Sequence, residues 1–188
     1  MTTPVLVAHI ITKLELGGAQ QNTLFTVSHL DASRFRPVLI SGEPGILDQE
    51  ARALSGVEFY QVPSLRRAIR PLADLRALIA LTVLLRRLNP TIVHTHSSKA
   101  GILGRWAARL AGVPIIIHSI HGFGFTRYQH PLVRRTLIAL ERRVSRFTTR
   151  FYAVSEANRC LGIELGLFSA DRCTVIRSGV DLEAFRRT

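Results

Sequence analysis

"VLVAHIITKLELGGAQQNTL", residues Val5–Leu24, contains the pattern that decides the fold. An apolar, β-branched run leads into two adjacent glycines, and a helix-like segment follows directly. Continuous apolar runs are typical of parallel strands that are buried on both faces. Glycines between such a strand and a helix leave the N–H groups at the start of the helix open to a phosphate. The stretch is neither G-x-G-x-x-G nor a P-loop, so neither common nucleotide motif applies.

The same alternation continues along the chain. Apolar runs predict strands over Val5–Ile11, Pro37–Ser41, Val57–Val62, Thr91–His96, Pro114–Ile120, Arg150–Ser155 and Cys173–Ser178. Helical periodicity predicts helices over Ala19–Leu30, Ile46–Leu54, Leu72–Leu88, Ala100–Ala111, Pro131–Thr149 and Glu156–Leu165. We therefore expect an α/β fold with a single doubly wound, mainly parallel, Rossmann-like sheet of six or seven strands, in one domain that spans residues 1–188.

The charge of the chain is strongly positive. The net charge is +12, and all basic residues except Lys13 and Lys99 are arginine. This balance favours phosphate groups, nucleic acid or an anionic membrane surface as partners, although a genome rich in arginine codons would produce it equally well. Aromatic residues do not interleave with the basic runs, so we expect no nucleic-acid partner. The positive charge taken alone would also fit a non-catalytic, polyanion-binding module.

Cysteine usage and hydropathy indicate a cytoplasmic protein. Cys160 and Cys173 have neither metal-ligand spacing nor a disulfide framework. The N-terminal residues lack the basic segment and cleavage site of a secretory signal. The longest apolar run, Ala77–Leu85, has nine residues, about half of what spans a bilayer.

Ligands of a doubly wound sheet bind at the carboxyl ends of its strands. The residues predicted there that suit an anionic ligand are Gly17, Gly18, Gln20, His96, Ser97, Lys99, His121, Gly122, Phe123 and Arg177. Lys99 opens a helix, where a positive charge is unfavourable unless it meets an anion such as an acceptor phosphate. Ser97 and Ser155 precede helices and are expected first as N-cap residues.

Two of the histidines have a spacing that suits metal ligands. His94 and His96 share one face of a strand, a spacing that suits a metal, but no third ligand is evident from the sequence. We therefore expect no metal. His118 lies within a strand and is expected as a packed, hydrogen-bonded core residue.

Four stretches carry a family resemblance. "HIITKLELGGAQQNTL", "IVHTHSSKAGILGRWAARLAGVPIIIHSIHGFGF", "FYAVSEANR" and "VIRSGVDLEAF" resemble, in this order, the N-terminal, acceptor-side half of a retaining family 4 glycosyltransferase of GT-B fold. The variant "HTHSSKAG" with "HGFGF" is most similar to bacterial members that build capsule, exopolysaccharide or other lipid-linked glycans. The resemblance implies transfer of a hexose from a nucleotide-sugar to a glycan or polyprenyl-linked acceptor, without a metal or other cofactor.

The resemblance also implies roles for residues. Gly17 and Gly18 match the loop that lets the donor diphosphate and sugar approach, and Gln20 stands where many relatives carry Glu. The alternative is a tight turn that needs glycine for a positive φ. His121 matches the catalytic histidine that faces the donor sugar. The residues expected on the acceptor side are His96, Ser97, Lys99, Gly122, Phe123 and Arg177, the last standing where many relatives carry Asn.

In relatives, a second domain follows the position where this chain ends and binds the nucleotide. We therefore expect the nucleotide-sugar-binding C-terminal domain to be absent here, and no glycosyl transfer by this chain alone. A non-catalytic polyanion- or membrane-binding subunit, which supports a separate catalytic partner, is the alternative.

The helix Pro131–Thr149 suggests peripheral binding to the inner face of the membrane. An apolar stripe is predicted to pack on the sheet, and it consists of Val133, Leu137, Leu140, Val144 and Phe147. A basic face would rest on anionic lipid and consists of Arg134, Arg135, Arg142 and Arg146, with Arg66, Arg67 and Arg70 nearby. A core-packed helix with a solvated basic face is the alternative.

Overall fold

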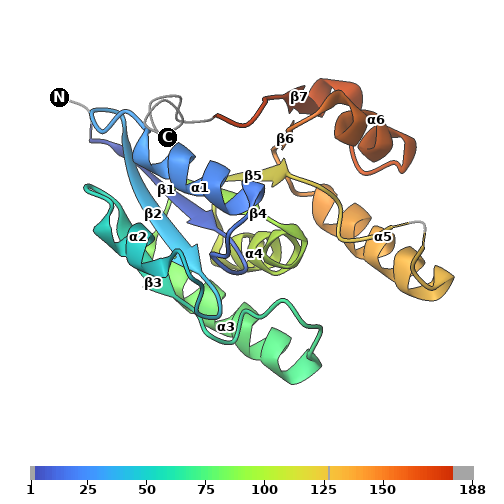
Figure 1. The fold of residues 1–188 in the computed structure, drawn as a ribbon, viewed down its shortest axis with the longest axis horizontal. Helices are drawn as coiled ribbons and strands as arrows, with labels where there is room; N and C mark the ends of the chain where they lie inside the picture. Colours follow the sequence, from blue (N-terminus) through green and yellow to red (C-terminus); the bar gives the residue numbers. More distant parts are fainter. Residues whose placement is uncertain (1–2, 127, 180–188) are drawn as a thin grey trace.

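The computed structural model describes residues 3–126 and 128–179, in which seven strands alternate with six helices (Figure 1). The elements are β1 (Val5–Ile10), α1 (Gly18–Ser28), β2 (Phe35–Ser41), α2 (Asp48–Ala53), β3 (Glu58–Gln61), α3 (Pro71–Leu88), β4 (Ile92–His96), α4 (Ser98–Ala111), β5 (Ile115–Ile120), α5 (Pro131–Ser145), β6 (Arg150–Ala153), α6 (Glu156–Glu164) and β7 (Cys173–Val175). All the predicted strands and helices are present. The final "VDLEAF" of the last family-like stretch lies outside the described residues.

The seven strands form one parallel sheet, in the order β3-β2-β1-β4-β5-β6-β7. This confirms the predicted doubly wound fold. The direction of winding reverses between β1 and β4, the position where sheets of this kind bind ligands at their carboxyl edge. Since all strands are parallel, the loops after β1, β4 and β5 leave the sheet at that one edge.

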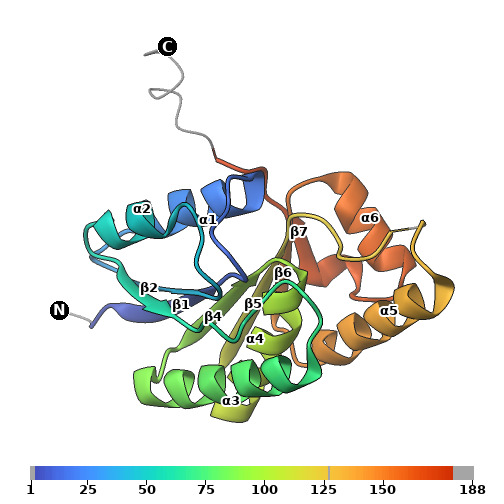
Figure 2. The ribbon, with the colours of Figure 1, turned by 60° about the horizontal axis from the view of Figure 1, so that its bottom comes forward.

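Helices cover the two faces of the sheet unequally (Figure 2). On one face, α1 and α2 pack over β1 and β2, in a core of buried residues that includes Leu24, Leu39 and Ala51. On the other face, α3 and α4 pack over β1, β2 and β4, and their core includes Leu81 and Ala107. The β5–β7 part of the sheet has a third core cluster, formed with α5 and the segment after α6.

An ion pair joins α4 to α5 inside the protein. The guanidinium of Arg105 is fully buried and donates from Nη2 to Glu141 Oε2 at 2.5 Å. It also donates to the backbone oxygen of Gly101 at 2.7 Å, and it lies 3.4 Å from Thr148 Oγ1. A buried charge is tolerated only when it is paired and hydrogen-bonded in this way.

The ion pair changes the packing face predicted for α5. The buried residues of this helix are Ile138, Glu141, Val144 and Ser145. Val133 and Leu140, which were assigned to the packed stripe, are exposed, so that assignment was wrong for them. The helix is rotated because Glu141 turns inward to meet Arg105, and periodicity of apolar residues alone does not detect a buried carboxylate.

We predict that replacing Arg105 with Met lowers the free energy of unfolding by about 3–5 kcal/mol, because Glu141 would remain buried and charged without a partner. The double variant Arg105→Met/Glu141→Leu should recover most of the loss. Urea denaturation followed by circular dichroism measures both. As a control, Arg36→Met removes the exposed Arg36–Glu58 pair and should cost less than about 1 kcal/mol. Equal losses for the two single variants would contradict the prediction.

Candidate functional site

The ends of β1 and β4 are tied together at the switch point. Thr12 Oγ1 and Ser97 Oγ lie 2.8 Å apart, and the backbone N–H of Ala100 donates to Thr12 Oγ1 at 3.0 Å. Ser97 occupies the N-cap position of α4 but makes no capping bond with its own side chain. Ser97 is thus the N-cap residue of α4, as expected, but the side-chain bond to the first turn of this helix comes from Thr12 in the neighbouring loop. Ser155 does cap α6, as expected.

Three histidines form a hydrogen-bonded chain that leads to the carboxyl edge. His9 Nδ1 lies 3.1 Å from His96 Nε2, and His96 Nδ1 lies 3.2 Å from His121 Nε2. His94 is alongside, with Nε2 2.8 Å from Ser119 Oγ. His9 was not predicted as a site residue from the sequence. Its only signal was its position within the first strand, and the pairing of His9 with His94 becomes visible only with the register of β1 on β4.

Burial holds these imidazoles neutral. It lowers the pKa of His9 and the pKa of His121 to about 4. The pKa values of His94 and His96 lie well below their usual range, first because of burial and then because neighbouring histidines disfavour a second charge. His118 packs in the core as expected, and burial, followed by the nearby Arg105, depresses its pKa strongly.

The Gly17–Gly18 loop does not need glycine for its backbone. Gly17 has a φ of 179°, which is extended backbone open to any residue, and Gly18 already belongs to α1. The alternative explanation, a tight turn that requires a positive φ, is therefore wrong. A Cβ on Gly18 would meet nothing within 4 Å, whereas a Cβ on Gly17 would lie 2.8 Å from Gln20 Oε1, and no side chain caps α1. Open space thus lies at Gly18, in front of uncapped N–H groups, while the Gln20 side chain fills the space beside Gly17 and donates from Nε2 to the backbone oxygen of Lys13.

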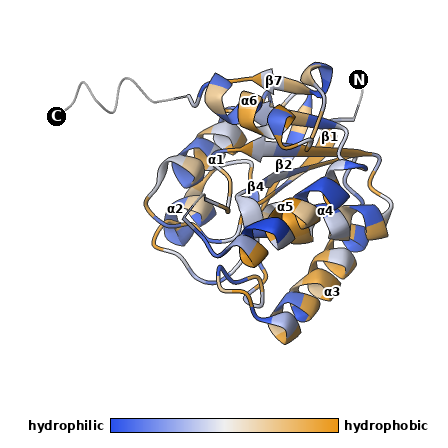
Figure 3. Cartoon of the chain, turned by 90° about the vertical axis from the view of Figure 1, so that its right-hand side faces the viewer, coloured by the Kyte–Doolittle hydropathy of each residue, from blue (hydrophilic) through white to orange (hydrophobic). Residues whose placement is uncertain are grey.

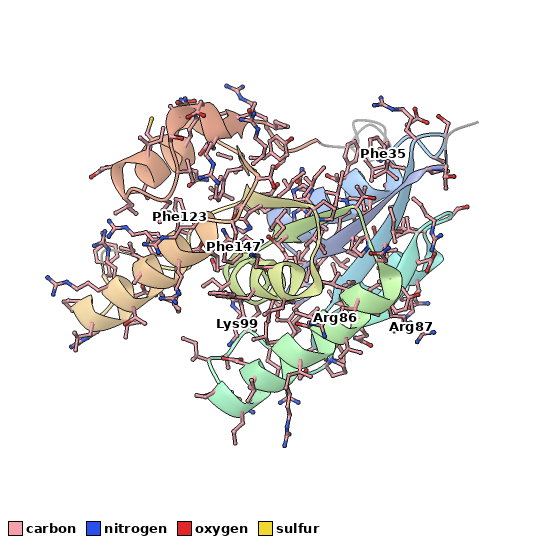
Figure 4. All side chains as sticks on the ribbon, turned by 180° about the vertical axis from the view of Figure 1, so that it is seen from behind. Phe35, Arg86, Arg87, Lys99, Phe123 and Phe147 are labelled. Carbon is pink, nitrogen blue, oxygen red and sulfur yellow. The ribbon has the colours of Figure 1, made fainter. Side chains whose placement is uncertain are left out.

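Lys99 is committed to a protein partner. Its Nζ lies 2.7 Å from an Asp74 carboxylate oxygen and 2.7 Å from the backbone oxygen of Ala68. Figure 4 shows Lys99 at the N-terminal start of α4, on the side that faces α3. This contact explains how a lysine is tolerated at a helix N-terminus, because a carboxylate on the neighbouring helix neutralises it.

A cavity of about 500 Å³ adjoins the histidine chain. His94, His96, Ser119 and Tyr152 line it from the sheet, and Arg177 lines it from the segment after β7. A hollow of about 610 Å³ lies before α3, and its lining contains none of the histidines. The cavity beside the histidines is therefore the better candidate site.

The structure brings most of the predicted site residues to one edge. The Gly17–Gly18 loop, Ser97 and His121 with Gly122 follow three adjacent strands, and His96 connects to His121. Phe123 stacks on Phe125, with ring centroids 4.9 Å apart.

Comparison with known proteins agrees with this architecture. The sequence model of Glycosyltransferase Family 4 matches residues 16–184. A relative from Escherichia coli, "UDP-Gal:alpha-D-GlcNAc-diphosphoundecaprenol alpha-1,3-galactosyltransferase", is 37% identical over 185 residues, which cover 96% of this chain and 46% of that protein. The chain therefore belongs to glycosyltransferase family 4.

Solved structures show the same fold. Anabaena Alr3699/HepE, in complex with UDP and glucose, matches with a TM-score of 0.74 and 15% identity, over 95% of this chain and 46% of that one. MurG of Acinetobacter baumannii matches with a TM-score of 0.65 and 16% identity, over 95% and 46%. The chain thus spans about half the length of these relatives and has the fold of the N-terminal half of GT-B enzymes.

The neutral histidines predict how stability depends on pH. Their pKa values are lower in the folded protein than the ordinary value of about 6.5, so below that pH the unfolded chain binds more protons. The free energy of unfolding should be highest above about pH 6.5. As the pH drops towards about 4, it should fall by about 1.4 kcal/mol per pH unit for each such histidine. Chemical denaturation at a series of pH values measures this slope, and a flat profile between about pH 7 and about pH 5 would exclude it.

Proposed function

We propose that this chain is the acceptor-side domain of a retaining glycosyltransferase that moves a hexose from a nucleotide-sugar to a lipid-linked glycan acceptor in cell-envelope polysaccharide synthesis. The bond between the sugar and the diphosphate breaks, the nucleoside diphosphate leaves with the bonding electrons, and an acceptor hydroxyl forms the new glycosidic bond and passes its proton to the departing diphosphate. Membership of glycosyltransferase family 4 is the observation that supports glycosyl transfer as the reaction type. The Escherichia coli relative, named for a diphosphoundecaprenol acceptor and an alpha linkage, supports the acceptor class and retention.

The donor side of the proposed site is the Gly17–Gly18 loop with Gln20. The uncapped N-terminus of α1 offers N–H groups to a diphosphate, and the open space at Gly18 lets it approach. These groups carry partial positive charge without a proton to lose, so the binding they provide does not depend on pH near neutrality.

His121 is the proposed catalytic residue, and its neutrality limits what it does. With a pKa near 4, its imidazole carries no positive charge at neutral pH. We therefore assign it a hydrogen bond to the donor sugar, which orients the reacting carbon, rather than electrostatic neutralisation of the leaving diphosphate. The contact with His96 holds one ring nitrogen and so constrains the direction in which the other points.

The acceptor side comprises His96, Ser97, Gly122, Phe123 and Arg177. Arg177 is exposed at the cavity and has no ion-pair partner among the described residues, so its guanidinium can meet an acceptor phosphate. Lys99, the remaining acceptor candidate, shares its charge with Asp74. We assign Lys99 a contact with the acceptor that is weaker than that of a lone cation.

We further propose that a second, nucleotide-binding domain completes the active site, in the same chain or in a partner, because the matched relatives are about twice as long. The nucleotide-sugar and the acceptor are the substrates, and the role assigned to the protein requires no metal. A non-catalytic subunit that holds a separate catalytic partner at the membrane is the alternative.

Measurements of sugar transfer distinguish the transferase domain from the non-catalytic subunit. Residues 1–188 alone should transfer no sugar above a buffer control, and the chain joined to the C-terminal half of the Escherichia coli relative should be active. In that fusion, His121→Ala should lower kcat by about 100-fold or more. His130→Asn, at an exposed histidine outside the cavity, should leave kcat unchanged. Robust transfer by residues 1–188 alone, or equal activity of the two variants, would refute the proposal.

We propose that the protein meets the membrane mainly through α3. No described helix is both long and apolar enough to cross a bilayer. The solvent side of α3 nevertheless exposes an apolar patch, the α3 surface, formed by Ile69, Leu72, Leu75, Ile79 and Val83. Figure 3 shows hydrophobic segments along α3 and strongly hydrophilic ones along α5. Leu132 and Val133 are also exposed at the start of α5, beside Arg134 and Arg135.

This surface suits the interface of an anionic membrane. Both α3 and α5 begin at the carboxyl edge of the sheet, where the acceptor would be used. Arg66, Arg70 and Arg76 accompany the α3 surface, and each basic residue near an anionic surface contributes about 1 kcal/mol. Burial of the apolar side chains in the membrane adds a contribution to the binding free energy that salt does not screen.

Vesicle co-sedimentation tests this surface. Leu72→Gln/Leu75→Gln/Ile79→Gln should weaken binding to anionic vesicles at both about 0.1 M and about 1 M salt, whereas Arg66→Gln/Arg70→Gln/Arg76→Gln should remove only the salt-sensitive part. Leu110→Gln, a similarly exposed leucine at the far end of α4, is the control. If the leucine variants sediment like the parent, the α3 surface has no membrane role.

A further inference from the structure

Three imidazoles project from the face of the sheet that α1 covers. His9 and His94 are register partners on β1 and β4, and His96 follows His94 by two residues. Because alternate residues of a strand share a face, all three rings point the same way. One nitrogen from each ring lies within 4.8 Å of those of the other two.

The ring nitrogens already have nearly the spacing of metal ligands. His9 Nδ1 and His96 Nε2 lie 3.1 Å apart. Two nitrogens that bind one tetrahedral zinc at about 2.0–2.1 Å lie about 3.3 Å from each other. A nitrogen of His94 lies within 4.8 Å of a nitrogen on each of the other two rings, and this side chain is only half-buried.

The opposite nitrogens of two rings are held by neighbours. His94 Nε2 contacts Ser119 Oγ at 2.8 Å, and His96 Nδ1 contacts His121 Nε2 at 3.2 Å. Such outer contacts fix ring orientation at metal sites and leave the facing nitrogen as the ligand. Here they leave His94 Nδ1 and His96 Nε2 for an ion.

His9 is incompletely satisfied by protein partners. Its ring is 1% exposed, and Nε2 has no hydrogen-bond partner among the described residues. Among the described residues, its one side-chain hydrogen bond is from Nδ1 to His96. His9 therefore loses little when a cation between the two rings replaces that bond, since a coordinate bond takes its place.

We propose that His9, His94 and His96 form a binding site for a divalent d-block cation, Zn²⁺ foremost, with a fourth position open to the adjoining cavity. Three nitrogen ligands without a carboxylate suit zinc and its neighbours, and do not suit Ca²⁺ or Mg²⁺. His94 and His96 line the cavity of about 500 Å³, so an oxygen ligand can reach the ion. A site with three protein ligands and one open position is the arrangement of exchangeable rather than closed zinc sites.

Bound zinc would also define the state of His96. With Nε2 on the metal, the remaining proton of His96 resides on Nδ1 and donates to His121 Nε2. The ion would then fix the tautomer that His121 presents at the carboxyl edge. The metal site itself does not depend on the proposed transferase function.

Zinc binding to the tag-free chain of 188 residues tests the proposal. After chelator treatment and dialysis, equilibrium dialysis with about 10 µM Zn²⁺ near pH 7.5 should give one bound ion per chain. His94→Gln should lower the affinity by at least about 100-fold. His130→Asn, at an exposed histidine outside the cluster, should bind like the parent.

Co²⁺ provides a signature that a merely structural role of His94 would not produce. Co²⁺ in the parent chain should show the visible absorption of a four-coordinate ion, and His94→Cys should add a sulfur-to-cobalt charge-transfer band. His9→Gln serves as a second ligand variant once circular dichroism shows that it folds, and His94, at the cavity, keeps the test decisive if it does not. Less than stoichiometric zinc in the parent, or unchanged affinity in His94→Gln, would overturn the proposal.

Discussion

The close seating of α4 against the sheet is the constraint on which the other features depend. A Cβ at Gly101 would lie 2.6 Å from a carbon of the His118 ring, and a Cβ at Gly104 would lie 2.9 Å from Thr95 Cγ2. Only glycine permits this approach at both positions. The seated helix brings its first turn to Thr12, Lys99 to Asp74, and Arg105 to the carboxylate of α5. The switch point, the edge residues and the α4–α5 contact thus share one cause.

The protein buries charge-bearing side chains in two ways. Arg105 and Glu141 keep their charges and share them across one short contact. The histidines on β1, β4 and β5 give up their charge, since burial depresses the pKa of each. Both solutions follow from the cost of moving an unpaired charge out of water. The second solution leaves lone pairs in the interior, and so places reactive nitrogens next to a cavity without adding to an already large positive charge.

The sequence was sufficient for the order and type of the elements, because buried parallel strands are apolar throughout and amphipathic helices separate them. It also indicated the edge residues, since a parallel sheet places all its carboxyl ends together. It was insufficient wherever a partner is remote in the chain. Asp74 meets Lys99 across 25 residues, and Thr12 reaches α4 across 88. No local pattern encodes such pairs.

Two further errors have the same origin. The orientation of α5 depends on a buried carboxylate, which apolar periodicity counts as a surface residue. The position of the His9 ring beside His94 and His96 could be predicted only with the register of β1 on β4. A shift of that register by one residue would have sent the His9 ring to the other face. The backbone angle at Gly17 removed the turn explanation that sequence alone had left open.

The bare start of α1 has a consequence for how sequence variation should act on this protein. Neither α1 nor α4 carries an acidic residue in its first turn, and the cap residue of neither helix makes a capping bond with its side chain. At α4, however, Thr12 Oγ1 accepts from the N–H of Ala100, so the dipole that stands uncompensated at this edge of the sheet is that of α1. This attraction comes from the backbone peptide units, so it is retained by any sequence that keeps the topology. Changes of side chains at this edge can alter which anion is preferred, while the preference for an anion persists as long as α1 does.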